Sequence, residues 1–366
     1  MLGNQVDLLD VGLRGKNMAT NKITTLSEFF HHSGAKYRVF DMGRRVVKLS
    51  PDEFVGFEWA KKPYPYPLKK AALFGIVFWN PKLPENRYVW FLNFPLDEQG
   101  LLIQAARDEF LVMLLDRVGE CMLAEEAGNN IEGALKDSPY TFKPREDRMA
   151  AFNAQVTKNL AVKASQYFDP AFAYFTGKED FSNWQSLGMQ GVADVAARLD
   201  DVEETLGLIE VIPSLPVEPF VMLCTFLENA QPSAGIVEHL AQRLTMELQE
   251  KEPDIQQICA CLRASSNSPA TGLVDLMVKH VLEHDCSRDI EILATISGRI
   301  WRVLEQDFIC TLYVEQLANN NAGQEGFSQL LVDLMYMPGL RVHIMQALRS
   351  PERSRKLSKA VGKMFG

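Results

Sequence analysis

The second half of the chain is a close succession of short helical patterns, and this feature limits its possible folds more than any other. After Asp200, apolar residues recur with helical spacing over segments of about 12–15 residues, separated by short polar or Pro- and Gly-containing breaks. The hexapeptide Gly235–Leu240 (GIVEHL) resembles Gly272–Met277 (GLVDLM) 37 residues later, and LVDLM recurs at Leu331–Met335 out of phase with that offset. The 37-residue spacing is typical of the two-helix unit of a solenoid. We therefore predict an all-α, helical-repeat-like (solenoid) region over residues 201–366.

The first third of the chain has strand patterns instead. Two of them flank a glycine turn, which predicts a β-hairpin, and two more are rich in aromatic and β-branched residues. Two capping boxes and a long apolar pattern predict helices between and after the strands. The predicted strands are 37–41, 45–49, 72–80 and 88–94, and the predicted helices begin after Thr25, after Ser50 and at Asp97, the last ending near Glu126. This order predicts an α+β domain with a small, mostly antiparallel sheet.

These patterns divide the chain into four segments. We predict a flexible N-terminal extension at residues 1–20, the α+β domain at 21–127, connecting helices at 128–200 and the repeat region at 201–366. Met18 is a plausible alternative start, so the extension is either mobile or an artefact of the assigned start. The repeat region ends in a basic helix.

The composition is that of a globular protein without a membrane span. Of the 366 residues, 47% are apolar and 23% are charged, and no apolar run approaches the roughly 18 residues needed to cross a bilayer. The six cysteines lie mostly within helical patterns, and the N-terminus has no long apolar signal segment. We therefore expect a cytoplasmic protein with free, mostly buried thiols.

Charge is distributed unevenly. The formal net charge of −9 argues against nucleic-acid binding by the protein as a whole. In contrast, Arg341–Gly366 contains seven basic residues and one acidic residue, a net charge of +6, which leaves −15 for the rest. Its helix also carries Leu357, Val361 and Met364 at helical spacing. It either contacts a membrane surface, an acidic protein or RNA, or caps the solenoid with a polar outer face. The basic candidates for partner binding are Arg349, Arg353, Arg355, Lys356, Lys359 and Lys363.

The segment Lys61–Lys70 is a second candidate for partner binding. Its three prolines alternate with tyrosines, which favours an extended, exposed conformation that is ordered before binding. A solvated linker is the alternative, because loops need no partner. The side chains in question are Lys61, Lys62, Tyr64, Tyr66, Lys69 and Lys70. Arg44 and Arg45 are candidates to join them in a nucleic-acid surface.

Two patterns resemble metal sites. His280, Glu283 and His284 match H-x-x-E-H, in which two histidines bind zinc, and Cys286 follows closely. However, His280 continues an apolar helical stripe, so we interpret it as part of the core and predict no metal ligands here.

Cys259 and Cys261 lie two residues apart on a predicted helix and therefore point to different faces, which favours two buried small side chains over a shared ion. The acidic residues Asp200, Asp201, Glu203 and Glu204 are interpreted as the cap and first turn of a helix rather than as an acid/base group.

Three stretches resemble a bacterial family known only as a domain of unknown function. They are Tyr37–Arg45 (YRVFDMGRR), Phe74–Asn80 (FGIVFWN) and Trp90–Leu111 (WFLNFPLDEQGLLIQAARDEFL). The resemblance runs from about Lys22 to the C-terminus. It implies a bacterial cytoplasmic protein, and it implies no activity, cofactor or catalytic residue.

No motif in the chain names a reaction. A P-loop, a G-x-S-x-G elbow and a G-x-G-x-x-G after a strand are all missing from the sequence. We therefore predict a non-enzymatic cytoplasmic protein-interaction module or scaffold, with no catalytic residues and no cofactor. A nucleic-acid-associated protein that uses the basic C-terminal tail is the alternative, and a metal-dependent hydrolase at His280 and His284 is less favoured. The sequence leaves the protein partner and the oligomeric state open.

Overall fold

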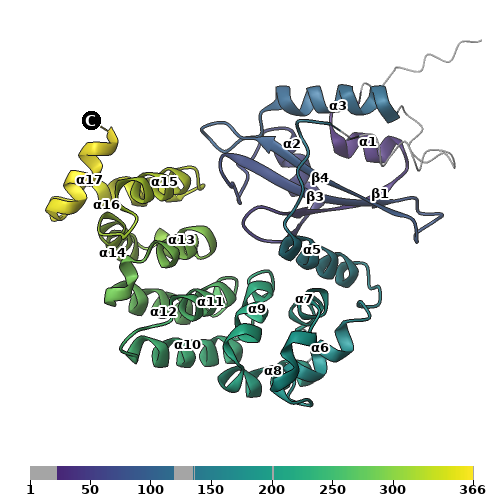
Figure 1. Cartoon of the computed structure of the whole chain (residues 1–366). Helices are drawn as coiled ribbons and strands as arrows, with labels where there is room; N and C mark the ends of the chain where they lie inside the picture. The colour runs from purple at the N-terminus through teal and green to yellow at the C-terminus, as the bar shows by residue number, and fades with distance from the viewer. Residues whose placement is uncertain (1–22, 119–134, 136, 200–201, 366) are drawn as a thin grey trace, which may run out of the picture.

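The computed structural model describes residues 23–118, 135, 137–199 and 202–365 (Figure 1). Three predictions fall wholly or partly outside these residues. They concern the N-terminal extension at 1–20, the end of the helix predicted to reach Glu126, and the acidic group that begins with Asp200 and Asp201. None of the helices in the described ranges is long and apolar enough to span a membrane.

A four-stranded antiparallel sheet organises residues 23–118, which we call the sheet region. Its strand order is β2-β1-β3-β4, and β1 pairs with β2 as the predicted hairpin. In the register, Val39 lies opposite Ile76, and Gly75 lies opposite Phe91. All four predicted strands are present, with β2 starting two residues later than expected. Their bounds are β1 Lys36–Asp41, β2 Val47–Leu49, β3 Ala71–Trp79 and β4 Arg87–Pro95.

Three helices cover one face of the sheet (Figure 1). Their apolar side chains pack with those of the strands in one aromatic-rich cluster that includes Phe30, Phe78 and Phe110. Thr25 and Ser50 are the N-caps of the first two helices, and Ser50 makes both hydrogen bonds of a capping box. The helices are α1 Leu26–His32, α2 Pro51–Glu58 and α3 Gln104–Val118.

The long helix was predicted to begin at Asp97, but α3 begins only at Gln104. The carboxylate of Asp97 accepts hydrogen bonds from the backbone N–H groups of Gln99 and Leu101, at 2.8 and 2.9 Å. Gly100 has a φ of 77° within the same turn. A local side-chain-to-backbone turn therefore replaces the first two predicted helical turns.

The opposite face of the sheet packs on α5 (Glu146–Asn159). Phe152 of this helix makes edge-to-face contacts with Phe40 and Phe91, with ring centroids 5.4 and 5.1 Å apart. A Cβ atom at Gly75 would lie 2.7 Å from the Phe152 ring, so the glycine permits this close approach. The helix thereby joins the sheet region to the helices that follow.

Short helices connect α5 to the repeat region. Among the connecting helices predicted at 128–200, a 3₁₀ turn and a helix are separated at Leu187 and Gly188, because these two residues are extended. In the described residues after β4, extended pairing is limited to isolated bridges such as that of Thr141. The elements are α6 Phe168–Phe175, η1 Phe181–Ser186, α7 Met189–Ala197, α8 Val202–Val211 and η2 Ile212–Ser214.

Nine helices form the C-terminal part of the described chain, which we call the helical arch. Its helices are α9 Val217–Leu227, α10 Ala234–Gln249, α11 Ile255–Ser265, α12 Thr271–Glu283, α13 Ile290–Arg299, α14 Asp307–Ala318, α15 Gly323–Met335, α16 Leu340–Arg349 and α17 Arg355–Phe365. The 3₁₀ turns η3 Asp285–Arg288 and η4 Trp301–Glu305 lie between them.

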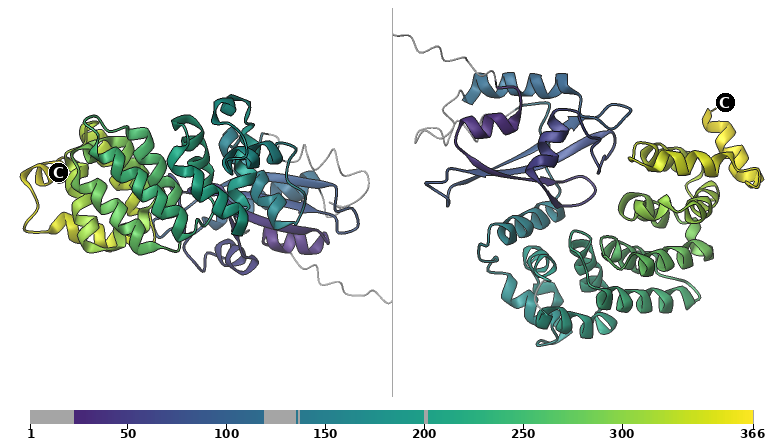
Figure 2. Two further views of the ribbon diagram at one scale, coloured as in Figure 1. Left: turned by 90° about the horizontal axis from the view of Figure 1, so that it is seen from below. Right: turned by 180° about the vertical axis from the view of Figure 1, so that it is seen from behind.

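The helical arch has two layers, as expected for a solenoid. The inner helices α9, α11, α13 and α15 pack on one another in that order, and so do the outer helices α10, α12, α14 and α16. The arch curves so that α13 and α15 face the loops of the sheet region (Figures 1 and 2). One continuous apolar core extends from Phe40 on the sheet to Leu357 on α17.

The two layers explain the sequence repeat. Gly235 and Gly272 are the second residues of α10 and α12, which are equivalent outer helices. The copy of LVDLM at Leu331–Met335 belongs to α15, an inner helix, and is therefore out of phase.

Candidate functional site between the sheet region and the helical arch

The loop between β1 and β2 inserts into the concave side of the helical arch, and Arg44 is its central contact. The Arg44 side chain is completely buried. Its Nε donates to the carbonyl of Pro67 at 2.6 Å, and its two Nη atoms contact the carbonyl of Ser297 at 3.1 Å and the carboxylate of Asp333 at 2.5 Å. Arg44 thus links the sheet region to both α13 and α15.

Arg45 makes a second set of contacts to the arch. Its Nη atoms donate to Asn267 Oδ1 and to the carbonyls of Ser266 and Arg299, at 2.6–2.7 Å. The ring of Trp301 lies 4.9 Å from this guanidinium and 5.4 Å from that of Arg44. Burial lowers the pKa of Arg45 to about 10, so the side chain stays charged at neutral pH.

The shape of this loop depends on Asp41. Its carboxylate accepts hydrogen bonds from the backbone N–H groups of Gly43 and Arg45, at 3.1 and 3.0 Å, and from the Tyr64 hydroxyl. Burial raises the pKa of Asp41 to about 6, although these hydrogen bonds lower it in part. Asp41 therefore fixes the loop from which Arg44 projects.

Glu228, the C-cap of α9, lies in a cluster of arginines. Its buried carboxylate pairs with Arg148 at 3.0 Å, Arg263 at 2.8 Å and Arg299 at 3.2 Å. Burial raises the pKa of Glu228, but the three guanidinium groups outweigh this effect and the net pKa is lowered. One carboxylate thus joins α5, α11 and α13 to the end of α9.

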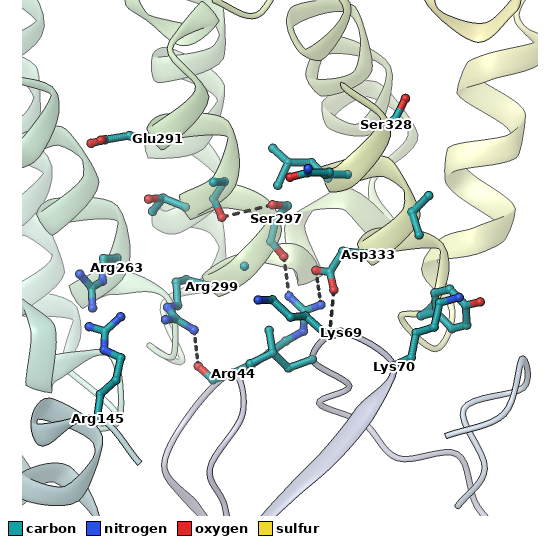
Figure 3. Close-up of a pocket in the computed structure, with 18 residues that line it drawn as sticks. Arg44, Lys69, Lys70, Arg145, Arg263, Glu291, Ser297, Arg299, Ser328 and Asp333 are labelled. Carbon is teal, nitrogen blue, oxygen red and sulfur yellow. Dashed lines mark hydrogen bonds and ion pairs between the residues drawn. The ribbon is translucent and has the colours of Figure 1, made fainter. Parts of the chain in front are cut away.

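A cleft of about 980 Å³ lies beside these contacts, between the sheet region and the inner helices (Figure 3). Helices α13 and α15 form one wall, and a turn of the sheet region and the start of α5 form the other. Its charged lining is mainly basic, and the acidic side chain of Asp333 is already paired with Arg44. The basic lining residues are Arg44, Lys69, Lys70, Arg145, Arg263 and Arg299, and the acidic ones are Glu291 and Asp333.

Lys69 and Lys70 project from a tight turn at the rim of the cleft. Leu68 and Ala71 exchange two backbone hydrogen bonds, and the two lysines between them have φ values of 50° and 63°. This geometry suits Asn-Gly, whereas lysine adopts it only at a cost in free energy. The Lys70 amino group lies 4.5 Å from the ring centroid of Tyr336, the C-cap of α15.

The segment Lys61–Lys70 was predicted to be exposed, and this is only partly correct. Lys61, Lys62, Lys69 and Lys70 are exposed, but Tyr64 is buried and Tyr66 is half-buried. The Tyr64 hydroxyl is held by Asp41, and the Tyr66 ring packs on Trp301 at 6.1 Å. The tyrosines therefore pack inside the protein, and Lys61 and Lys62 lie outside the cleft lining.

The prediction that Arg44 and Arg45 contribute to a nucleic-acid surface is wrong. Arg44 is 0% exposed and Arg45 is 2% exposed, and both side chains donate hydrogen bonds to the helical arch. The sequence does not show this, because each contact joins segments more than 200 residues apart.

The basic C-terminal helix packs as a terminal cap. Leu357 is completely buried, and α17 contacts α14, α15 and α16. All six basic candidates on this segment are exposed, and on α17 they lie opposite the packed face. They are Arg349, Arg353, Arg355, Lys356, Lys359 and Lys363. The helix therefore combines a packed apolar face with a free basic one.

The prediction that His280 belongs to the core is wrong. His280 is exposed on α12, because the buried stripe of that helix runs through Val274, Met277 and Val281. His284 lies at the C-cap, where its Nδ1 accepts a hydrogen bond from the Cys286 backbone at 3.2 Å. Within the described ranges, no three His, Cys, Asp or Glu side chains are grouped as metal ligands.

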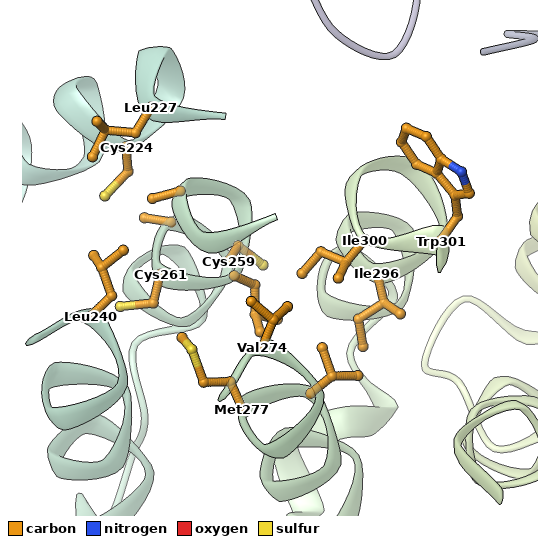
Figure 4. Packing of buried hydrophobic residues seen from close by; sticks show 14 of the residues in the cluster. Cys224, Leu227, Leu240, Cys259, Cys261, Val274, Met277, Ile296, Ile300 and Trp301 are labelled. Atoms are coloured by element: carbon orange, nitrogen blue, oxygen red, sulfur yellow. The ribbon is translucent and has the colours of Figure 1, made fainter. Parts of the chain in front are cut away.

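Three cysteines of the arch are packing residues. Cys224 and Cys261 are completely or almost completely buried, and Cys259 is 9% exposed. Cys259 and Cys261 point in different directions, as predicted (Figure 4). Burial raises the pKa of Cys259 to about 11 and that of Cys261 to about 12, so neither is a reactive thiolate at neutral pH.

Sequence reasoning missed most of the cleft. Glu228, Arg263, Arg299 and Asp333 follow one another at intervals of 34–36 residues, close to the length of one repeat. All four lie at or near the C-terminal ends of successive inner helices. A charged residue that recurs with the repeat period is therefore the signal that could have located the site.

In a comparison with family models, residues 21–365 match the model of a protein of unknown function, DUF3549. This match covers almost the whole chain. The chain belongs to the DUF3549 family. No curated protein and no solved structure matches this DUF3549 chain.

Proposed function

We propose that this protein is a non-enzymatic protein-interaction module whose cleft binds an acidic segment of a partner protein. The observation that carries the proposal is the charge of the lining, which includes six basic residues and two acidic ones. The arginine–carboxylate pairs Arg44–Asp333 and Arg263–Glu228 fix the walls. Lys69, Lys70 and Arg145 remain exposed there.

The contrast between the cleft and the whole protein makes the charge argument stronger. The net charge of the chain is −9, so an acidic peptide is repelled at long range by most of the surface. Binding of such a peptide therefore requires a local basic site. The volume of about 980 Å³ is at the upper end of the range of small-molecule pockets, which leaves space for an extended peptide.

The walls of the cleft are also ordered before binding. Arg44 and Arg45 fix the sheet region against the arch through hydrogen bonds to α13 and to the end of α11. Binding of a partner then costs less conformational entropy than it would at a mobile site, because the walls need no further ordering. The backbone of the two lysines at the rim is also ordered, because their turn holds them at positive φ values that lysine rarely adopts.

The test uses a fluorescein-labelled oligoglutamate peptide and fluorescence anisotropy at low salt. We expect saturable binding that weakens as salt rises, and a loss of about tenfold in affinity for Lys69→Glu combined with Lys70→Glu. The matched control is Lys61→Glu with Lys62→Glu, which changes the same charge on the same segment outside the cleft. If the full-length protein does not bind the peptide, or if both pairs weaken binding equally, the proposal is wrong.

Nucleic-acid association is the second candidate function, and the exposed basic face of α17 favours it. Arg355, Lys356, Lys359 and Lys363 are all exposed on this helix. Deletion of the tail would uncover the apolar surface that Leu357 covers, so charge reversal is the better test. We expect Lys356→Glu with Lys359→Glu to abolish salt-sensitive filter binding of RNA and duplex DNA. Unchanged filter binding in this variant would eliminate the second candidate.

A further inference from the structure

We propose that the acidic segment carries a phosphorylated serine or threonine, and that Arg145, Arg263 and Arg299 receive its phosphate group at one end of the cleft. This inference rests on the proposed function and specifies which chemical group the cleft recognises. It concerns only that corner of the lining, and not the lysine turn at the other end.

Three separate elements bring these arginines together. Arg145 is the N-cap of α5, Arg263 lies in the last turn of α11, and Arg299 ends α13. Figure 3 shows the guanidinium groups of Arg145 and Arg263 pointing toward each other, with that of Arg299 beside them. Arg263 and Arg299 also share the carboxylate of Glu228, at 2.8 and 3.2 Å, which fixes their positions.

Each of these guanidinium groups keeps donors for a ligand. Arg263 uses its Nε for Glu228, and Arg299 uses its Nε for Glu228 and one Nη for the carbonyl of Arg44. Arg145 uses its Nε and one Nη for Asp147. Because a guanidinium has five N–H donors, every one of the three has donors left after these contacts.

The charge of the corner matches a phosphate monoester. Including Arg148, four arginines meet the two carboxylates Glu228 and Asp147 here, which leaves a surplus of two positive charges. A phosphorylated side chain carries a charge of about −1.5 to −2 at pH 7, whereas glutamate carries only −1. Guanidinium groups also bind phosphate oxygens with paired hydrogen bonds, which favours arginine over lysine at such a position.

Arg44 does not take part in this site. Its guanidinium is completely buried and already contacts Pro67, Ser297 and Asp333. The phosphate corner is therefore distinct from the contact that joins the sheet region to α15.

The experiment compares two fluorescein-labelled glutamate-rich peptides that differ at one position, phosphoserine in one and glutamate in the other. We expect the full-length protein to bind the phosphopeptide about tenfold more tightly, and inorganic phosphate to compete with this preference. Arg145→Ala should remove most of the preference, because it deletes one of the three guanidinium groups that receive the phosphate. The Arg145 side chain is 82% exposed, so its loss leaves the fold intact. Arg288→Ala is the matched control, since it also removes an exposed arginine paired with a nearby aspartate.

A second variant separates positive charge from guanidinium geometry. Arg263→Lys keeps the charge beside Glu228 but removes the planar set of donors, so we expect the ratio of phosphopeptide affinity to glutamate-peptide affinity to fall. A site that recognises charge alone would keep the ratio unchanged.

The outcomes separate the two proposals. Equal binding of both peptides overturns the phosphate corner and leaves the acidic-segment proposal standing, whereas binding of neither overturns both. Inorganic phosphate that binds alone as tightly as the phosphopeptide overturns the phosphorylated segment as the ligand.

Discussion

Arg44 on the β1–β2 loop and Asp333 on α15 form a 2.5 Å ion pair that joins positions 289 residues apart. The chain continues from the sheet region into α5, and the helical arch comes back to the sheet region at this pair. The cleft lies next to the pair, because both residues belong to its lining. The shape of the candidate site is therefore tied to this long-range pair, together with the hydrogen bonds that Arg45 makes to the arch.

Loss of Arg44 should destabilise the protein strongly. Arg44→Met removes the partner of Asp333 and leaves the buried carbonyls of Pro67 and Ser297 without a donor, so we expect the free energy of unfolding to fall by about 3 kcal/mol. In contrast, Arg145→Met breaks an exposed pair and should cost at most about 0.5 kcal/mol. Urea denaturation measures both, and equal losses would contradict the role given to Arg44.

Glu228 should be as important for stability as Arg44. Glu228→Gln leaves Arg148, Arg263 and Arg299 without their shared countercharge, and we expect a loss of about 3–5 kcal/mol at neutral pH. Glu218→Gln, an exposed position on the same helix, is the control and should be nearly neutral. Thermal unfolding followed by circular dichroism measures the difference.

The effect of Glu228 should depend on pH in a defined direction. The pKa of Glu228 is lowered in the folded protein, so its contribution is present above its ordinary pKa of 4.5 and is lost as the pH falls through the folded value. The gap in stability between the wild-type protein and Glu228→Gln should therefore shrink in acid. A gap that widens below pH 4.5 would show that the carboxylate is not stabilised by its arginines.

Residues better suited to the lysine turn should raise the stability of the protein and weaken its binding of the peptide. Lys69→Asn with Lys70→Gly suits the positive φ values of the turn, and we expect about 1 kcal/mol of added stability after loss of the Lys70–Tyr336 contact. The same variant should bind the oligoglutamate peptide more weakly, because two charges leave the rim. Lys61→Asn with Lys62→Gly is the control, and it should gain no stability. Calorimetry and anisotropy on one preparation test both statements.

Glu58 should give the opposite pH dependence from Glu228. Its buried carboxylate accepts hydrogen bonds from Leu26 and Ser27 at the start of α1, but burial outweighs them and raises its pKa to about 7. A raised pKa means that stability is fully present below pH 4.5 and declines as the pH rises toward 7, by about 3 kcal/mol in total. Glu58→Gln should flatten this part of the stability curve, whereas exposed Glu98→Gln should leave it unchanged. An unaltered slope in Glu58→Gln would contradict the assignment.

The secondary structure was predictable because its causes are local. The two longest strands coincide with segments rich in aromatic and β-branched residues, and the capping box at Ser50 is present with both of its hydrogen bonds. The late start of α3 was missed for an equally local reason, since the Asp97 turn competes with the helix. The burial of His280 was predicted wrongly because the stripe of apolar residues on α12 could be drawn through either of two adjacent faces.

The sequence by itself determined the four strands, the order of the helices, the basic face of α17 and the family to which the chain belongs. The tertiary structure alone decided that Arg44 and Arg45 are buried, that Tyr64 packs inward and that the cleft exists. The physical reason is distance along the chain. Helical and strand periodicity depends on neighbours within a few residues. In contrast, the Arg44–Asp333 pair forms only once the arch has curved back onto the sheet region, and the Arg148–Glu228 pair forms only when α5 packs on α9.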